Sequence, residues 1–135
     1  MVRYLIVCLI NGLLFGVMDA LINANPFAQK TFEFYKPIAR TSVNAPAGVI
    51  IDLLYGFVLG FIFLMIYQVL PGDSGIFKGL VFALIIWFLR VFMNAASQWM
   101  MFNIPFSSII YILITGLIEM IVLGMIYGIF LKPEK

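Results

Sequence analysis

The sequence contains no histidine, a single cysteine and few charged residues. Charged residues occupy 10% of the 135 positions, against about 25% in soluble domains. Without histidine the chain lacks the commonest general base and the usual zinc ligand, and Cys8 has no partner for an internal disulfide. It also contains no phosphate-binding loop, dinucleotide-binding glycine turn or nucleophile elbow. We therefore expect no enzymatic activity, no cofactor and no metal site.

Hydrophobic residues, in contrast, make up 64% of the chain, and the mean hydropathy is +1.14. This composition excludes a water-soluble enzyme and a disordered tail. The net charge of +2 is too small to attract nucleic acid. The composition therefore predicts an integral membrane protein, with the lipid bilayer as its first partner.

Four apolar stretches reach the length of about 20 residues that a membrane-spanning helix needs. We predict an all-α, polytopic integral membrane protein that forms one domain, a bundle of four transmembrane helices. The predicted spans are residues 4–24, 48–70, 77–102 and 106–131. A long interfacial loop is predicted at 25–47 and a tight turn at 71–76. Because the later links are short, consecutive helices are expected to be antiparallel neighbours.

The interfacial loop combines aromatic and basic side chains, which is typical of the lipid headgroup layer. Phe27, Thr31, Phe34 and Ile38 recur at helical spacing, and Pro37 is expected to end or kink a helix there. The pattern fits a connection with membrane anchors, and it also fits a lid or docking surface.

Basic residues outside the spans bear on orientation. The side with both termini carries Arg3, Lys78, Lys132 and Lys135. The side with the interfacial loop carries Lys30, Lys36 and Arg40. By the positive-inside rule this difference favours cytoplasmic N- and C-termini in the cell membrane, with dual topology as the alternative.

Two segments suggest an internal repeat. Residues 12–15, Gly-Leu-Leu-Phe, match residues 79–82, Gly-Leu-Val-Phe, and the same offset aligns Asp52 with Glu119. An even number of spans per unit gives a parallel repeat. We predict a tandem repeat of two helical hairpins.

Pairs of glycines four residues apart occur in three of the spans. Such pairs let the backbones of neighbouring helices approach closely. The predicted packing glycines are Gly12, Gly16, Gly56, Gly60, Gly124 and Gly128. Gly79 and Ala83 are expected to play this part in the third span.

Polar residues inside the spans are the strongest functional indication. A charge in the bilayer costs about 2.5–3.5 kcal/mol on insertion scales, so each one needs a partner or water. Helical spacing predicts that these residues form a wedge, which opens on the side of the interfacial loop and ends near the middle of the bilayer. The candidate site consists of Asp19, Asn23, Asp52, Arg90, Asn94, Gln98, Thr115 and Glu119.

Three functions fit this pattern. The first is a helix-packing subunit of a membrane complex or homo-oligomer, in which Arg90 pairs with Glu119 or an aspartate and other membrane subunits or further copies are the partners. The second is a small-solute or ion transporter that uses the polar wedge. The third is a lipid-headgroup-binding membrane protein, because the planar fork of an arginine suits carboxylate and phosphate groups.

Overall fold

The computed structural model describes residues 1–38 and 44–133, and within these residues it contains helices but no strands. Four helical segments are long and apolar enough to cross a membrane, which confirms the all-α, four-helix membrane fold. These segments are α1 (Val2–Ala24), α3 (Ala45–Ile66), the continuous helix α4 (Gly75–Trp87), η2 (Phe88–Phe92) and α5 (Met93–Met101), and α6 (Phe106–Phe130).

The second span, α3, begins and ends earlier than the predicted range 48–70. Its start is set by Asn44, whose side chain accepts a hydrogen bond from the backbone N–H of Ala47 at 3.2 Å. At its other end the chain leaves the helix after Ile66 and continues in a turn, in which the N–H of Leu70 donates to the Ile66 carbonyl. Hydropathy alone extends a span into such an apolar turn.

The third span begins within the predicted turn 71–76. The hydroxyl of Ser74 accepts a hydrogen bond from the N–H of Phe77 at 3.1 Å, which caps α4 and starts it directly after the serine. The connection before it turns at Gly72, whose φ of 99° lies in the region that favours glycine.

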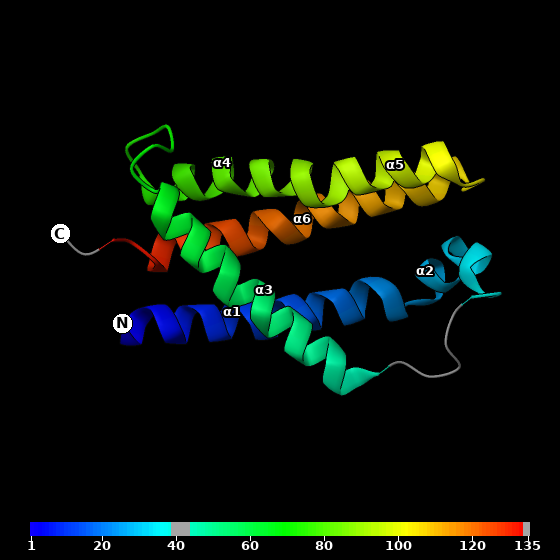
Figure 1. Cartoon of the computed structure of the whole chain (residues 1–135), viewed down its shortest axis with the longest axis horizontal. Helices are drawn as coiled ribbons and strands as arrows, with labels where there is room; N and C mark the ends of the chain where they lie inside the picture. Colours follow the sequence, from blue (N-terminus) through cyan, green and yellow to red (C-terminus); the bar gives the residue numbers. More distant parts are fainter. Residues whose placement is uncertain (39–43, 134–135) are drawn as a thin grey trace.

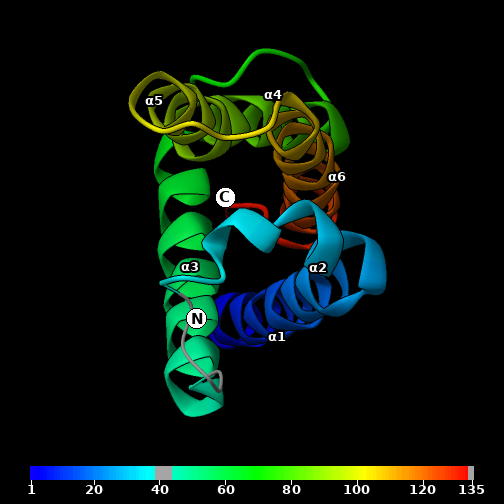
Figure 2. The same cartoon turned by 90° about the vertical axis from the view of Figure 1, so that its right-hand side faces the viewer.

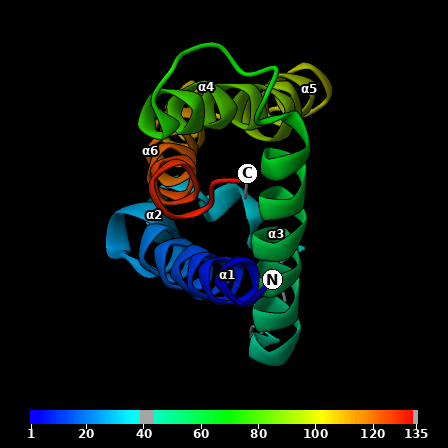
Figure 3. The same ribbon diagram turned by 90° about the vertical axis from the view of Figure 1, so that its left-hand side faces the viewer.

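The four spans form two pairs, α1 with α3 and α4 with α6, and contacts between α1 and α6 join the pairs. Seen end-on, α6 lies on one side of the molecule and α3 on the other, with α4 along the top edge and α1 along the bottom edge (Figures 2 and 3). In Figure 1, α3 crosses the other helices at a steep angle, and both termini lie at the same end.

Glycines bring α4 and α6 into backbone contact. A Cβ atom at Gly124 would collide with the carbonyl oxygen of Gly79, and one at Gly128 would collide with that of Gly75. The Cβ of Ala83 would lie 2.8 Å from a Cβ at Gly124. Gly75 falls in the predicted turn 71–76, yet its place in the first turn of α4, four residues before Gly79, makes it a packing glycine.

The pair α1 and α3 meets in the same way. A Cβ at Gly56 would lie 2.6 Å from the carbonyl oxygen of Cys8 and 2.7 Å from the backbone nitrogen of Gly12. One turn further along α3, a Cβ at Gly60 would collide with the sulfur of Cys8. Neither helix can take a larger side chain at these crossing points without moving apart.

Aromatic rings fill the half of the molecule near the termini. The ring of Phe63 lies 5.2 Å from that of Phe82 and 5.9 Å from that of Tyr127, measured between centroids. All three side chains are buried, and the hydroxyl of Tyr127 donates to the carbonyl oxygen of Gly56. Together with the aliphatic residues around them these rings form a dense apolar core.

The outer surface of the spans is apolar. In the most hydrophobic stretch of each span, only 22–33% of the residues are buried inside the molecule. Large apolar side chains such as Leu21, Leu54 and Met65 are exposed instead. Hydrocarbon chains are the environment that such a surface suits, so the protein contacts the lipid bilayer.

The long connection contains the short helix α2 (Pro26–Thr31), which is tied to the bundle. Asn25 caps this helix by accepting a hydrogen bond from the N–H of Ala28 at 2.8 Å. At the other end, the buried hydroxyl of Ser108 on α6 donates to the carbonyl oxygen of Thr31 at 2.7 Å. The connection is therefore fastened against α6 at both ends of α2, since the Asn25 amide also donates to Tyr111.

A 3-10 turn, η1 (Glu33–Tyr35), follows α2. Lys36 and Glu33 form an exposed ion pair of 2.9 Å. The hydrogen bond and the charge of Lys36 hold the pKa of Glu33 below its usual value. Arg40 and Lys135, two of the basic residues on which the predicted orientation depends, lie outside the described residues, and so does the side chain of Phe34.

Candidate intramembrane charged site

The four charged residues predicted inside the spans face one region of the molecule. Asp19 comes from α1, Asp52 from α3, Arg90 from η2 and Glu119 from α6. The carboxyl groups of Asp19 and Glu119 lie within hydrogen-bonding reach of each other, and the charge of Arg90 acts on all three acids. We call these four residues the charged cluster.

Aromatic rings, rather than a carboxylate, hold the guanidinium of Arg90. Its central carbon lies 4.8 Å from the centroid of the Phe15 ring and 4.9 Å from that of the Tyr55 ring. These are cation–π contacts. In residues 1–38 and 44–133 the only ion pair within 4.0 Å is the exposed pair of Lys36 and Glu33. The direct pairing of Arg90 with Glu119 or an aspartate, expected for a structural link, is therefore not present.

Arg90 lies in a π-helical turn, an element that the sequence pattern did not predict. The segment η2 interrupts the α-helix between α4 and α5 and holds Arg90 at its centre. The missing side chain of Gly116 on α6 leaves room for this turn, because a Cβ there would lie 2.8 Å from Cγ1 of Val91. Gly116 is one turn from Glu119, so the close approach of Val91 brings η2 near that acid.

Glu119 is the most deeply buried member of the charged cluster. Its side chain is 3% exposed, and its Oε1 atom has no hydrogen-bond partner among the described residues. Asp52 is less buried and lies against α1, where a Cβ at Gly16 would be 3.0 Å from its Oδ2 atom. Gly16, predicted as a packing glycine, thus makes room for a carboxylate.

An open groove of about 630 Å³ lies at the end of the molecule where α2 packs. Its lining includes three of the predicted site residues. The lining residues are Asn23, Ala28, Gln29, Phe32, Tyr35, Lys36, Asn94, Gln98 and Ile112. The hydroxyl of Tyr35 donates to Oε1 of Gln98 at 2.8 Å across this groove. Tyr35 and Gln29 are not among the predicted site residues, because they fall in the predicted interfacial loop.

The groove adjoins the charged cluster. Asn23 follows Asp19 by four residues on α1, and its amide donates to the Asp19 carbonyl oxygen at 2.9 Å. Asn94 follows Arg90 by four residues on the neighbouring helix. One helical turn, about 5.4 Å along each axis, therefore separates the groove lining from the charges.

Thr115, the remaining predicted site residue, is occupied within its own helix. Its hydroxyl donates to the carbonyl oxygen of Tyr111 at 2.7 Å, which is the local bond that threonine often makes inside helices. It is not among the residues that line the groove. The spacing that placed Thr115 on the same stripe as Glu119 could not reveal this bond.

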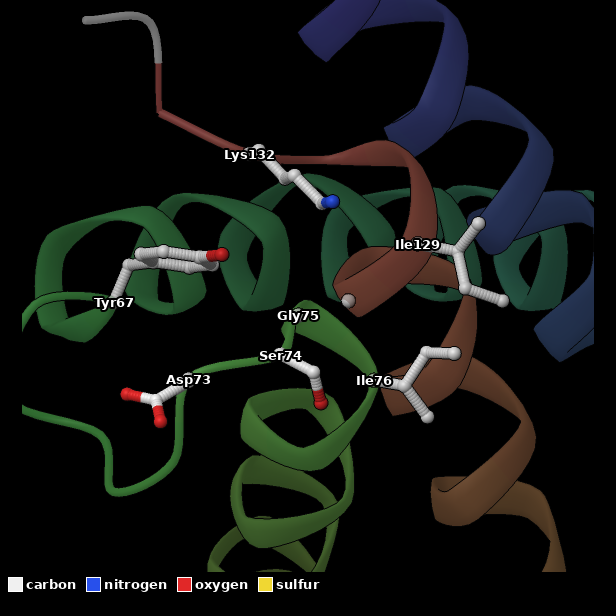
Figure 4. A pocket seen from close by; sticks show the side chains of 8 residues that line it. Tyr67, Asp73, Ser74, Gly75, Ile76, Ile129 and Lys132 are labelled. Atoms are coloured by element: carbon white, nitrogen blue, oxygen red, sulfur yellow. The ribbon is translucent and has the colours of Figure 1, made fainter.

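A second hollow, of about 240 Å³, lies near the end where the termini are (Figure 4). Tyr67, Ser74 and Lys132 are among its lining residues. Beside it the buried ammonium of Lys78 donates to the Tyr67 carbonyl oxygen at 2.7 Å and lies 4.4 Å above the Tyr67 ring. None of the predicted polar site residues reaches this hollow.

In the part of the chain that the structure describes, no three acidic or cysteine side chains come together as a metal site. Comparisons with protein-family models, with curated proteins and with solved structures found no match. Function is therefore inferred from the chemistry of the site itself.

Proposed function

We propose that this multi-pass membrane protein transports a small polar or charged solute and that the charged cluster binds it. The observation that carries the proposal is the state of Arg90 and Glu119. Arg90 lies among three acids without an ion pair to any of them, and Glu119 has a buried oxygen without a partner. Charged groups inside a membrane that do not form ion pairs with one another are available to bind a ligand.

A purely structural role for these charges has less support. Charges that lock helices together do so through direct, hydrogen-bonded pairs, which offset their cost in hydrocarbon. Here the helix pairs already meet through their backbones at Gly12 and Gly56 and at Gly79 and Gly124. The bundle thus has a packing device that does not need Arg90.

The two ends of the molecule differ in a way that suits one-sided access. Amide side chains line the groove, and two of them, Asn23 and Asn94, lie one turn from the charged cluster. On the other side, the buried rings of Phe63, Phe82 and Tyr127 separate the cluster from the end with the termini. A transporter that opens to one side at a time needs such an asymmetry in each of its states.

The experiment is a transport screen on the full chain reconstituted in liposomes. Uptake of isotope-labelled sodium, potassium, phosphate, succinate, guanidinium or tetraethylammonium is measured, because uptake also reports an exchange that moves no net charge. We expect at least one of these solutes to enter vesicles that contain the wild type. The uptake should disappear in the double variant Arg90→Leu with Glu119→Leu, which removes both charges together and should still insert in the membrane.

The other two functions predict different results. Gently purified protein that gives no solute uptake and elutes with other membrane proteins would contradict transport and favour a subunit of a complex. Protein that gives no uptake and retains a phospholipid through purification, lost in Arg90→Leu, would favour headgroup binding. Glu33→Gln serves as the control in each arm, because Glu33 is exposed and lies outside the cluster.

A further inference from the structure

Asp19 and Glu119 form a pair of carboxyl groups inside the bundle. They come from α1 and α6 and lie within hydrogen-bonding reach of each other. Two ionised carboxylates at this separation repel each other strongly where little water is present, whereas one shared proton turns the repulsion into a hydrogen bond. Such a pair of carboxyl groups can hold one proton in common.

Charged groups from three other elements lie near Glu119, whereas α4, which packs most closely against α6, contributes none there. Asp19 lies on α1, Asp52 on α3 and Arg90 on η2. The cluster contains three carboxyl groups and one guanidinium. With one proton shared between two of the carboxyl groups, its net charge is therefore −1. The Oε1 atom of Glu119, buried and without a partner among the described residues, is a free acceptor at this place. The cluster is therefore net negative whether or not the shared proton is present, which favours the approach of a cation.

The surroundings indicate what kind of cation fits. The three carboxyl groups do not converge as a metal site within the described residues. The rings of Phe15 and Tyr55, with centroids 5.4 Å apart, already carry the guanidinium of Arg90. Aromatic faces with nearby carboxylates bind cations whose charge is spread over several atoms. Arg90 itself shows that this environment accommodates an organic cation.

We infer that the cluster exchanges one proton for one monovalent organic cation, with Asp19 and Glu119 as the proton-binding pair. In the exchange the shared O–H bond breaks, and the proton leaves to water in the groove. The cation then takes the place of the lost positive charge, beside the two carboxylates and the rings, so that the net charge of the site is unchanged. This inference rests on the proposed transport function.

Proton movement tests the coupling. Liposomes with the full chain and a trapped pH-sensitive dye receive guanidinium chloride or tetraethylammonium chloride outside, with sodium chloride as the comparison. Either organic cation should make the wild-type vesicles alkaline inside, whereas sodium chloride should not. Glu119→Gln and Asp19→Asn should reduce the response to that of protein-free vesicles, and Glu33→Gln should retain it.

Infrared spectroscopy tests the proton itself without reference to transport. At neutral pH the reconstituted wild type should show the carbonyl stretch of a protonated carboxylic acid inside the bilayer. The band should vanish in Glu119→Gln and in Asp19→Asn, and guanidinium should weaken it in the wild type. Glu33→Gln should leave it unchanged, since Glu33 is exposed to water and ionised at neutral pH.

The outcomes separate the inference from the proposed function. A solute that crosses the membrane with no movement of protons, or with an unchanged response in Glu119→Gln, overturns the exchange and leaves transport standing. A response to sodium alone overturns the class of cargo. The infrared band without transport of any solute overturns the transport function, and with it the exchange.

Discussion

At the scale of single residues, magnitudes decide how firmly Arg90 is held. A guanidinium within a span costs about 2.5–3.5 kcal/mol on insertion scales. A cation–π contact returns about 0.5–1 kcal/mol where water has access and about 2 kcal/mol where it has none. Arg90 is only partly buried, so its contacts with Phe15 and Tyr55 belong nearer the lower value. The rings offset part of the cost, and the nearby acids or a ligand supply the rest.

Tyr127→Phe tests the contribution of one buried hydroxyl. The Tyr127 side chain is fully buried, and its hydroxyl donates to the carbonyl oxygen of Gly56, where α6 meets α3. We expect the variant to lose about 1 kcal/mol of stability, the usual net value of such a bond. Thermal unfolding in detergent, followed by tryptophan fluorescence, measures the change.

Tyr4→Phe is the matched control. The hydroxyl of Tyr4 donates to the carbonyl oxygen of Phe57 at 2.7 Å, but its side chain is only partly buried, close to the start of α1. Water can replace this bond, so the loss should be smaller. Equal losses in the two variants would show that burial does not set the value of these bonds.

At the scale of helices, glycine contacts decide how closely the spans approach. Gly124→Ala would place a Cβ against the carbonyl oxygen of Gly79 and 2.8 Å from the Cβ of Ala83. Both of these atoms are fixed to the backbone of α4 and cannot move aside by rotation of a side chain. We expect a loss of about 1–3 kcal/mol, as for other overpacked sites, measured by thermal unfolding in detergent.

Gly48→Ala provides the opposite case within the same protein. A Cβ at Gly48 would meet no atom within 4 Å, and the residue lies in the first turn of α3. Alanine there should leave stability unchanged or raise it by up to about 1 kcal/mol, because glycine is the poorer helix former. A large loss at Gly48 would mean that another molecule covers this part of α3.

Much of this arrangement is readable from the sequence, because it follows from length and periodicity. Apolar runs of sufficient length define the four spans, and helical spacing places Asp19, Asp52, Arg90 and Glu119 on inward faces. The internal repeat stays a prediction. What the sequence does not reveal depends on contacts between particular helices. The π turn that carries Arg90 is one example, and the pairing of Gly75 with Gly128 is another.

At the scale of the whole molecule, an even number of spans places both termini on one side of the membrane and α2 on the other (Figure 1). Lys30→Cys, on α2, and Lys132→Cys, after α6, should therefore react with an impermeant maleimide from opposite sides. Both positions are exposed, and the native Cys8 is fully buried and should stay unlabelled.

Labelling of intact cells measures this orientation. If the termini are cytoplasmic, as the basic residues predict, only the Lys30→Cys variant should be labelled from outside. Comparable labelling of both variants would contradict a single orientation and point to dual topology. Labelling of the wild type would contradict the burial of Cys8.

The π turn at η2 has a consequence for changes in chain length. A π turn holds one residue more than the α-turn that spans the same stretch of helix. A chain shortened by one residue between Phe88 and Phe92 could therefore keep the rest of its helix in place, with Asn94 and Gln98 still facing the groove. Deletions inside a membrane span normally turn everything beyond them to a new face. In this helix a residue can be deleted within the π turn, and the change in structure is then confined to the position of Arg90.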